Sequence, residues 1–255
     1  MRGLNLPQVL WLVRHGQSAG NVARDLAEAG GLALIDLATR DIDVPLSNLG
    51  VDQANALGSW FGQLTAEQQP TAILSSPYVR AVHTAQLIQD AAQLPARTKI
   101  IVDERLREKE FGILDRLTVL GISQKYPELF EQRSHVGKFY FRPPGGESWC
   151  DVILRLRNLF DTISREHAGE RLLIVGHQVI VNCFRYLIEG MSEQQILDID
   201  RAGDVPNCAV SSYELVADVE GKTQLLPKLI NFVAPLQQAG AAVTAEPDVP
   251  VAAKA

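Results

Sequence analysis

Short apolar runs that alternate with amphipathic segments dominate the chain. Residues 8–13 form an apolar, β-branched run that ends abruptly in Arg-His-Gly. A buried parallel strand delivers polar groups to its carboxyl end in this way. Ser47 is placed to cap a helix whose apolar positions, from Ala54 to Leu64, recur at helical spacing. The pattern therefore predicts a first strand and an amphipathic helix.

The same alternation continues along the chain. Residues 72–74 predict a second short strand, and residues 79–92 predict the next helix. Ser148 and Asp151 form a capping box before an apolar stripe, and the segment RLLIVGH, which ends at His177, predicts a strand after that helix. Such alternation predicts an α/β fold: a three-layer α/β/α sandwich with a mostly parallel central sheet. Ligands in these folds bind beyond the carboxyl ends of the strands.

Two segments depart from this alternation. Between residues 104 and 146 the periodicity is weak, and the stretch GKFYFRPPGGE is rich in aromatic residues, bases, proline and glycine. We interpret this segment as a cap inserted over the site. The Ala, Pro and Val-rich residues 235–255 predict a disordered tail, so residues 1–234 are expected to form one domain.

Composition limits the class of protein. At 255 residues and 46% hydrophobic, the chain is long enough to bury a full core. Its net charge of −6 provides no diffuse positive field for nucleic acid. The apolar run near the N-terminus is too short for a signal peptide, and no stretch approaches the ~20 apolar residues of a membrane span. Three scattered cysteines indicate reduced thiols. We expect a cytoplasmic protein that binds neither nucleic acid nor membrane, while its oligomeric state is left open.

The strand ends carry the candidate chemistry. In LVRHGQSAGN, Gly16 allows the backbone to turn, and the adjacent Arg14 and His15 suit one phosphate, the guanidinium as a bidentate fork and the imidazole as a nucleophile. Arg80 follows a Ser-Ser-Pro turn at the start of a helix, where backbone amides also favour an anion. His177 ends a third strand. Each of these residues alone also fits a plain structural role, as a salt bridge or a satisfied polar contact.

Two further residues complete the pattern. Glu108 stands in the charged run RLREKEFG, from which it could approach the same pocket as a general acid, although most carboxylates in such a run are only solvated. Asn21 follows Arg-His-Gly at short distance. The order of these motifs, with Ser-Ser-Pro before Arg80 and Leu-x-Glu at Glu108, resembles the histidine phosphatase superfamily over about residues 9–216.

That resemblance implies a role for each residue. His15 is then the phosphohistidine nucleophile, Arg14, Arg80 and His177 form the phosphate pocket, Asn21 assists it, and Glu108 is the proton donor. Arg107 and Glu110 match less well. Two arginines and a second histidine supply charge neutralisation without a metal, so we expect a metal-independent phosphatase without a cofactor, acting on a small phosphorylated substrate.

Within the superfamily the run GHQVIV is similar to the fructose-2,6-bisphosphatase domain, although Asn182 stands where that domain has an arginine. A cofactor-dependent phosphoglycerate-type mutase shares the same catalytic positions and is the main alternative. Such mutases have an aromatic residue directly before the asparagine, whereas Gly20 precedes Asn21 here. A catalytically weak phosphate-binding protein is the third reading, because a fold does not by itself imply turnover. His83, His135 and His167 are not expected to take part.

Overall fold

Six strands form one sheet in the order β3-β2-β4-β1-β5-β6 in the computed structural model, which describes residues 6–245. The strands are β1 (Val9–Arg14), β2 (Ala72–Ser75), β3 (Ile100–Val102), β4 (Arg171–Gly176), β5 (Val210–Ala217) and β6 (Thr223–Phe232). The four strands from β3 to β1 run parallel, and β5 and β6 add an antiparallel edge. The predicted mostly parallel sheet is thereby confirmed, and the antiparallel edge extends it.

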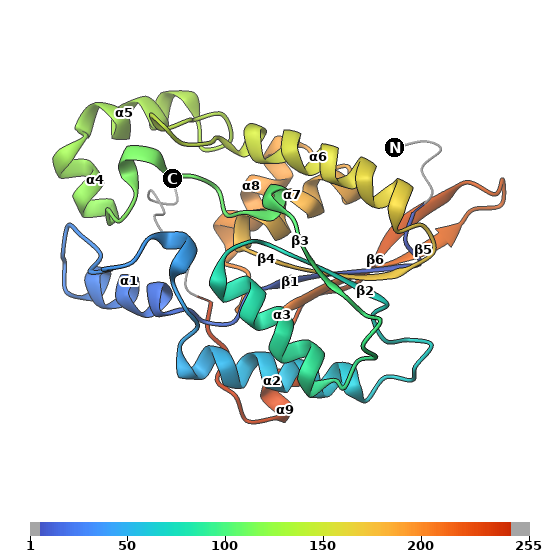
Figure 1. Cartoon of the computed structure of the whole chain (residues 1–255). Helices are drawn as coiled ribbons and strands as arrows, with labels where there is room; N and C mark the ends of the chain where they lie inside the picture. Colours follow the sequence, from blue (N-terminus) through green and yellow to red (C-terminus); the bar gives the residue numbers. More distant parts are fainter. Residues whose placement is uncertain (1–5, 246–255) are drawn as a thin grey trace.

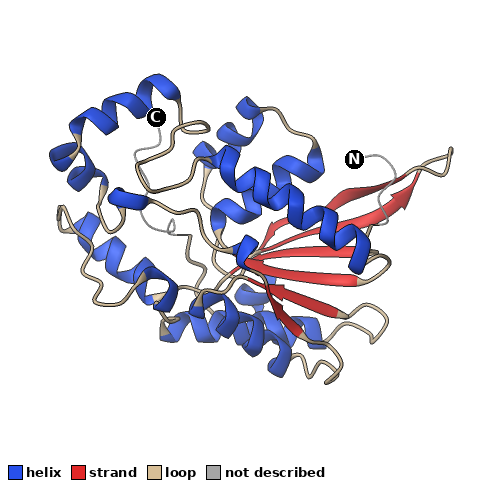
Figure 2. Ribbon diagram, turned by 45° about the horizontal axis from the view of Figure 1, so that its top comes forward, coloured by secondary structure: helices blue, strands red, loops and turns tan. Residues whose placement is uncertain are grey.

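Helices cover both faces of the sheet (Figures 1 and 2). On one face lie α6 (Trp149–Glu166) and α7 (Gln178–Glu189); on the other lie α2 (Asn48–Gly62) and α3 (Val79–Ala91). The alternating side chains of a strand point to opposite faces. In β1, Leu10 and Leu12 accordingly join the core under α6 and α7, whereas Trp11 and Val13 join the core under α2 and α3. The predicted three-layer sandwich is confirmed.

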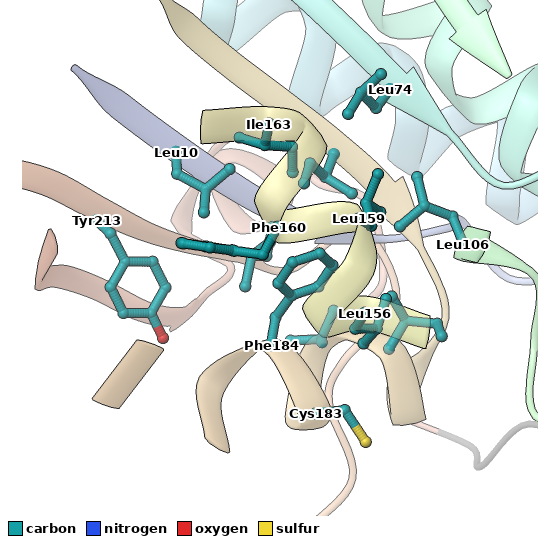
Figure 3. Close-up of a cluster of buried hydrophobic side chains, with 14 of the residues drawn as sticks. Leu10, Leu74, Leu106, Leu156, Leu159, Phe160, Ile163, Cys183, Phe184 and Tyr213 are labelled. Atoms are coloured by element: carbon teal, nitrogen blue, oxygen red, sulfur yellow. The ribbon is translucent and has the colours of Figure 1, made fainter. Parts of the chain in front are cut away.

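The apolar stripe of α6 builds the larger core (Figure 3). Leu156, Leu159, Phe160 and Ile163 recur every three or four residues and are at most 2% exposed. Full burial of such a side chain contributes roughly 1.5–3 kcal/mol. The stripe faces α7 across Phe184, which is also fully buried. The two helices pack against each other, and His177 lies at the junction between β4 and α7.

The segment between β3 and α6 has a small core of its own. It contains two 3₁₀ turns, η2 (Glu104–Leu106) and η3 (Gly112–Leu114), and two helices, α4 (Val119–Lys125) and α5 (Pro127–Val136). The buried residues of this separate core are Leu114, Leu117, Ile122 and Phe141. In Figure 1 the helices α4 and α5 lie beyond the end of the sheet at which β1 and β4 lead into their helices. The sequence marked this segment as irregular and did not predict its helices.

The described chain also contains α1 (Ala19–Ala29), the 3₁₀ turn η1 (Asp41–Asp43) and α8 (Glu193–Ala202). Ser18 caps helix α1, and its side chain accepts a hydrogen bond from the backbone N–H of Asn21 in a capping box. Within residues 6–245 no helix combines the length and the apolar character needed to cross a bilayer.

The expected disordered tail is wrong for residues 235–245. Helix α9 (Ala234–Gln238) packs on α2, and Leu236 is fully buried there. Beyond it, the Thr244 carbonyl accepts a hydrogen bond of 2.8 Å from the backbone N–H of Asn207. The buried Leu236 and a few polar contacts order this segment, although its Ala-rich composition predicted disorder. Residues 246–255, the rest of the expected tail, lie outside the described residues.

Candidate active site

Two neighbouring strands bring His15 and His177 together. Strands β1 and β4 are paired in parallel with Arg14 opposite Gly176, so the next residue on each strand is a histidine. The backbone N–H of His15 donates to the Gly176 carbonyl at 2.9 Å. Both side chains are fully buried, and their ring centroids are 5.1 Å apart at 68°. The sheet register alone therefore creates a histidine pair at its carboxyl edge.

Each nitrogen of the His15 ring contacts a neighbouring polar group. Nδ1 lies 2.7 Å from the carbonyl oxygen of Gly16, and Nε2 lies 3.2 Å from Nε of Arg80. A carbonyl can only accept and a guanidinium can only donate. Both contacts therefore require the same neutral tautomer, with the proton on Nδ1 and the lone pair on Nε2. A neutral imidazole with its Nε2 lone pair directed into the site is suited to nucleophilic attack.

Gly16 packs closely against the start of α2. A Cβ at this position would overlap the carbonyl oxygen of Gly50, at the start of α2. The Gly16 N–H donates to Oγ1 of Thr84 at 3.1 Å, and this hydroxyl in turn donates to the Arg80 carbonyl at 2.7 Å. Glycine is needed here because the loop after β1 packs directly on α2.

Arg80 lies in the first turn of α3 and is 3% exposed. Besides His15, its guanidinium contacts Asp41: Nη1 donates to the Asp41 carbonyl at 2.6 Å and to Oδ1 at 2.9 Å, and Nη2 donates to Oδ2 at 3.3 Å. The guanidinium carbon lies 4.7 Å from the ring centroid of Tyr78. Asp41 in η1 is a partner that no motif in the sequence indicated, because it is 39 residues away in an irregular loop.

His177 is held by residues from two other parts of the chain. Its Nε2 lies 2.8 Å from the Ser76 hydroxyl, and its Nδ1 lies 3.7 Å from Oε2 of Glu108. The Tyr78 ring packs against it edge-on, with centroids 5.0 Å apart. Ser76 belongs to the Ser-Ser-Pro turn, but only the fold shows that its hydroxyl reaches the second histidine.

Glu108 is the buried carboxylate of its charged run. It is 1% exposed and accepts a 2.6 Å hydrogen bond from the Lys109 backbone N–H, while Glu104 and Glu110 are exposed. Arg155 on α6 donates to the Glu108 carbonyl at 3.3 Å and fixes this loop. The structure therefore brings Glu108, and not its acidic neighbours, to His177.

Arg14 and Asn21 are both buried. Arg14 is fully buried, and its Nη1 donates to the Val205 carbonyl at 2.6 Å. Asn21 is 1% exposed, and its Oδ1 accepts from the backbone N–H and the hydroxyl of Ser18, both at 2.9 Å. Its side-chain oxygen therefore has a helix-capping function.

The less well matched residues lie apart from the histidine pair. Arg107 donates to Glu147 at 2.6 Å, and the half-exposed Glu110 contacts the Tyr78 hydroxyl at 3.4 Å. His135 and His167 pair with Glu131 and Glu170 on their own local segments. Asn182 is buried within α7, and neither polar atom of its side chain has a hydrogen-bond partner.

Glu108 and Gln178 line a pocket in the structure. Its aromatic and apolar wall includes Phe111, Phe141 and Trp149, and its cationic residues are Lys109, Arg133 and Lys138. Most of this lining comes from the segment between β3 and α6. Within the described part of the chain, no group of three or more His, Cys, Asp or Glu side chains is placed to hold a metal ion.

Comparison with known proteins identifies the family. The sequence profile of the histidine phosphatase superfamily (branch 1) matches residues 10–223. The chain belongs to the histidine phosphatase superfamily. Its fold agrees: the α-ribazole phosphatase of Shigella flexneri superposes with a TM-score of 0.66 at 21% identity, covering 88% of this chain and 98% of that one.

Relatives within the superfamily have different activities. A 6-phosphofructo-2-kinase/fructose-2,6-bisphosphatase of Caenorhabditis elegans is 31% identical over 179 residues, which are 70% of this chain. The match spans 33% of that longer relative. A 2,3-bisphosphoglycerate-dependent phosphoglycerate mutase of Sinorhizobium fredii is 28% identical over 221 residues, 82% of this chain and 96% of the mutase.

Proposed function

We propose that this protein is a phosphomonoesterase that works through a phosphohistidine on His15 and needs no metal. The observation that carries the proposal is the fixed tautomer of His15, whose Nε2 lone pair lies 3.2 Å from Nε of Arg80. A phosphate placed at this nitrogen meets the guanidinium of Arg80. The buried Arg14 is the last residue of β1 and directly precedes His15. Two guanidinium groups and a second histidine neutralise the charge of phosphoryl transfer.

The first half-reaction transfers the phosphoryl group to the enzyme. Nε2 of His15 attacks phosphorus while the bond to the ester oxygen breaks, and protonated Glu108 gives its proton to the departing alkoxide. Arg14, Arg80 and His177 bind the oxygens of the transferred group. Asn21 contributes through its amide nitrogen, because its Oδ1 is engaged by Ser18.

The second half-reaction restores the enzyme. The Glu108 carboxylate takes a proton from water, the water oxygen forms a bond to phosphorus, and the bond between nitrogen and phosphorus breaks. Inorganic phosphate leaves, and His15 and Glu108 return to their starting protonation states.

A phosphoglycerate-type mutase is the second candidate, supported by the match along 96% of the Sinorhizobium fredii mutase. A mutase retains the phosphoryl group on the histidine and returns it to a second oxygen of the substrate. A mutase therefore depends on a bisphosphorylated primer. A phosphatase hydrolyses the phosphohistidine with water and needs no primer.

The discriminating experiment is a screen of phosphorylated metabolites with a phosphate-release assay. We expect stoichiometric release of inorganic phosphate without 2,3-bisphosphoglycerate and in the presence of EDTA, and none from the His15→Ala variant. Isomerisation that requires the primer would identify a mutase. Loss of activity in EDTA that a divalent cation restores would contradict the metal-independent mechanism.

A further inference from the structure

The pocket beside Glu108 has an excess of positive charge. Its lining has three cationic side chains, Lys109, Arg133 and Lys138, and two carboxylates, Glu108 and Asp200. The lining is therefore net positive, and more so when Glu108 carries the proton of the proposed reaction, whereas the whole chain has a net charge of −6. A local cationic pocket on an acidic protein favours an anionic ligand.

Asp200 balances the charge at the far side of the pocket. The Lys138 ammonium forms a salt bridge with Asp200, whose side chain is 5% exposed. The negative charge of Asp200 also acts on Arg133, where it opposes the lowering of the pKa by burial. The charge of Asp200 thus acts on both Lys138 and Arg133.

Lys109 is a buried cation of the lining on which the charges of Glu108 and Glu147 act without a salt bridge. It is 9% exposed, and its ammonium nitrogen lies 4.4 Å from the ring centroid of Phe111. Within residues 6–245 no carboxylate lies within ion-pair distance of this nitrogen. An ammonium removed from water without an ion pair is costly, and desolvation lowers the pKa of Lys109 to about 8. An anionic ligand in the pocket would offset that cost.

We propose that the pocket binds a second anionic group of the substrate, a carboxylate or a phosphate, with Lys109 as its principal cation. Phe111, Phe141 and Trp149 contact the body that joins this group to the reacting phosphate. Glu108 lines the pocket and also faces His177, so the two anion sites share a wall. The inference rests on the proposed function and names its substrate class: a phosphomonoester whose apolar or ring-shaped alcohol carries an anion at its far end.

The test compares three phosphomonoesters that share one leaving oxygen: 2-phenylethyl phosphate, its 4-carboxylate and its 4-phosphonate. The ring substituent is insulated from the ester oxygen by two methylene groups, so leaving-group chemistry is the same in all three. We expect kcat/KM for at least one anionic substrate to exceed that for the uncharged parent by about tenfold or more, the range for a hydrogen bond to a charged group. The two anionic substrates distinguish a carboxylate site from a phosphate site.

Variants test whether Lys109 causes the preference for anionic substrates. Lys109→Met should reduce the ratio of anionic to parent kcat/KM to near one, and Lys109→Arg should retain most of it. Lys228→Met removes an exposed lysine on β6 as a matched control and should leave the ratio unchanged. Thermal unfolding of each variant checks that the fold is intact.

Binding gives a readout that does not depend on turnover. The matched phosphonates, 2-phenylethylphosphonate and its 4-carboxylate, cannot be hydrolysed and can be titrated calorimetrically into wild type and Lys109→Met. A wild type without preference for the anionic ligands, or a preference that survives in Lys109→Met, would overturn the inference. Hydrolysis of the parent compound tests the proposed function separately, since it requires no second anion.

Discussion

Nε of Arg80 lies 3.2 Å from Nε2 of His15, and this contact orients the candidate nucleophile before any substrate binds. The carbonyl of Gly16 holds the opposite ring nitrogen at 2.7 Å. One loop and one helix thereby fix both the tautomer and the direction of the lone pair. A ring that needs no reorientation reduces the entropic cost of reaching the transition state.

The role of Glu108 predicts a dependence on the leaving group. Glu108→Gln keeps the size of the side chain and removes the proton, so kcat/KM for an alkyl phosphate should fall by roughly the 10²–10⁴ of general acid catalysis. p-Nitrophenyl phosphate leaves as a stabilised phenolate and should lose much less. kcat/KM is the appropriate quantity because it excludes the dephosphorylation step that both substrates share.

The exposed Glu110→Gln is the matched control, because it removes a neighbouring carboxyl group that contacts Tyr78 and not His177. Equal losses for the alkyl and aryl substrates in Glu108→Gln would exclude Glu108 as the proton donor.

Asp41 predicts an effect on phosphate affinity. Its carboxylate accepts two hydrogen bonds from Arg80 and places a negative charge beside the site of a phosphate dianion. Asp41→Asn removes the charge and keeps an acceptor, so competitive inhibition by inorganic phosphate should strengthen by about fivefold, equivalent to about 1 kcal/mol. Asp41→Ala also removes the anchor and should weaken inhibition. If both variants weaken inhibition equally, the main role of Asp41 is to position Arg80.

Lys109 predicts a pH-dependent stability difference. Burial lowers its pKa to about 8 from an ordinary value of 10.5, so between these values the unfolded chain holds a proton that the folded chain has lost. Stability must then rise with pH across this window. Lys109→Met should be more stable than wild type at pH 7, by about 1–3 kcal/mol, and the difference should shrink from pH 8 towards 10.5. Urea unfolding at several pH values measures it, and a difference that does not change with pH would contradict the buried charge.

The strand-end residues of the site could be predicted from the sequence, because the carboxyl ends of parallel strands meet at one edge of the sheet. Arg14, His15 and His177 each follow a continuous apolar run, and the register of β1 with β4 places them side by side. Glu108 was different, since it lies in a charged loop and only the family resemblance selected it from Glu104 and Glu110. Its burial is visible only in the fold.

Other features left no periodic signal. Helix α5 has no buried residue and therefore no apolar stripe, and α9 has five residues with Leu236 as its anchor. The contact of Asp41 with Arg80 joins a loop to a helix through polar atoms, and hydrophobic pattern cannot encode such a pairing. The burial of Lys109 could not be predicted either, because a lysine in a charged run is ordinarily solvated.

The central claim is that His15 carries the phosphoryl group, and trapping with an alkaline quench tests it most directly. Wild type mixed briefly with a ³²P-labelled phosphomonoester should yield protein-bound phosphate that is labile to acid and stable to base, and peptide mapping should locate it on His15. His15→Ala should carry no label, whereas His83→Ala should label like wild type. Label that persists in His15→Ala, or turnover without any labelled intermediate in wild type, would contradict the account.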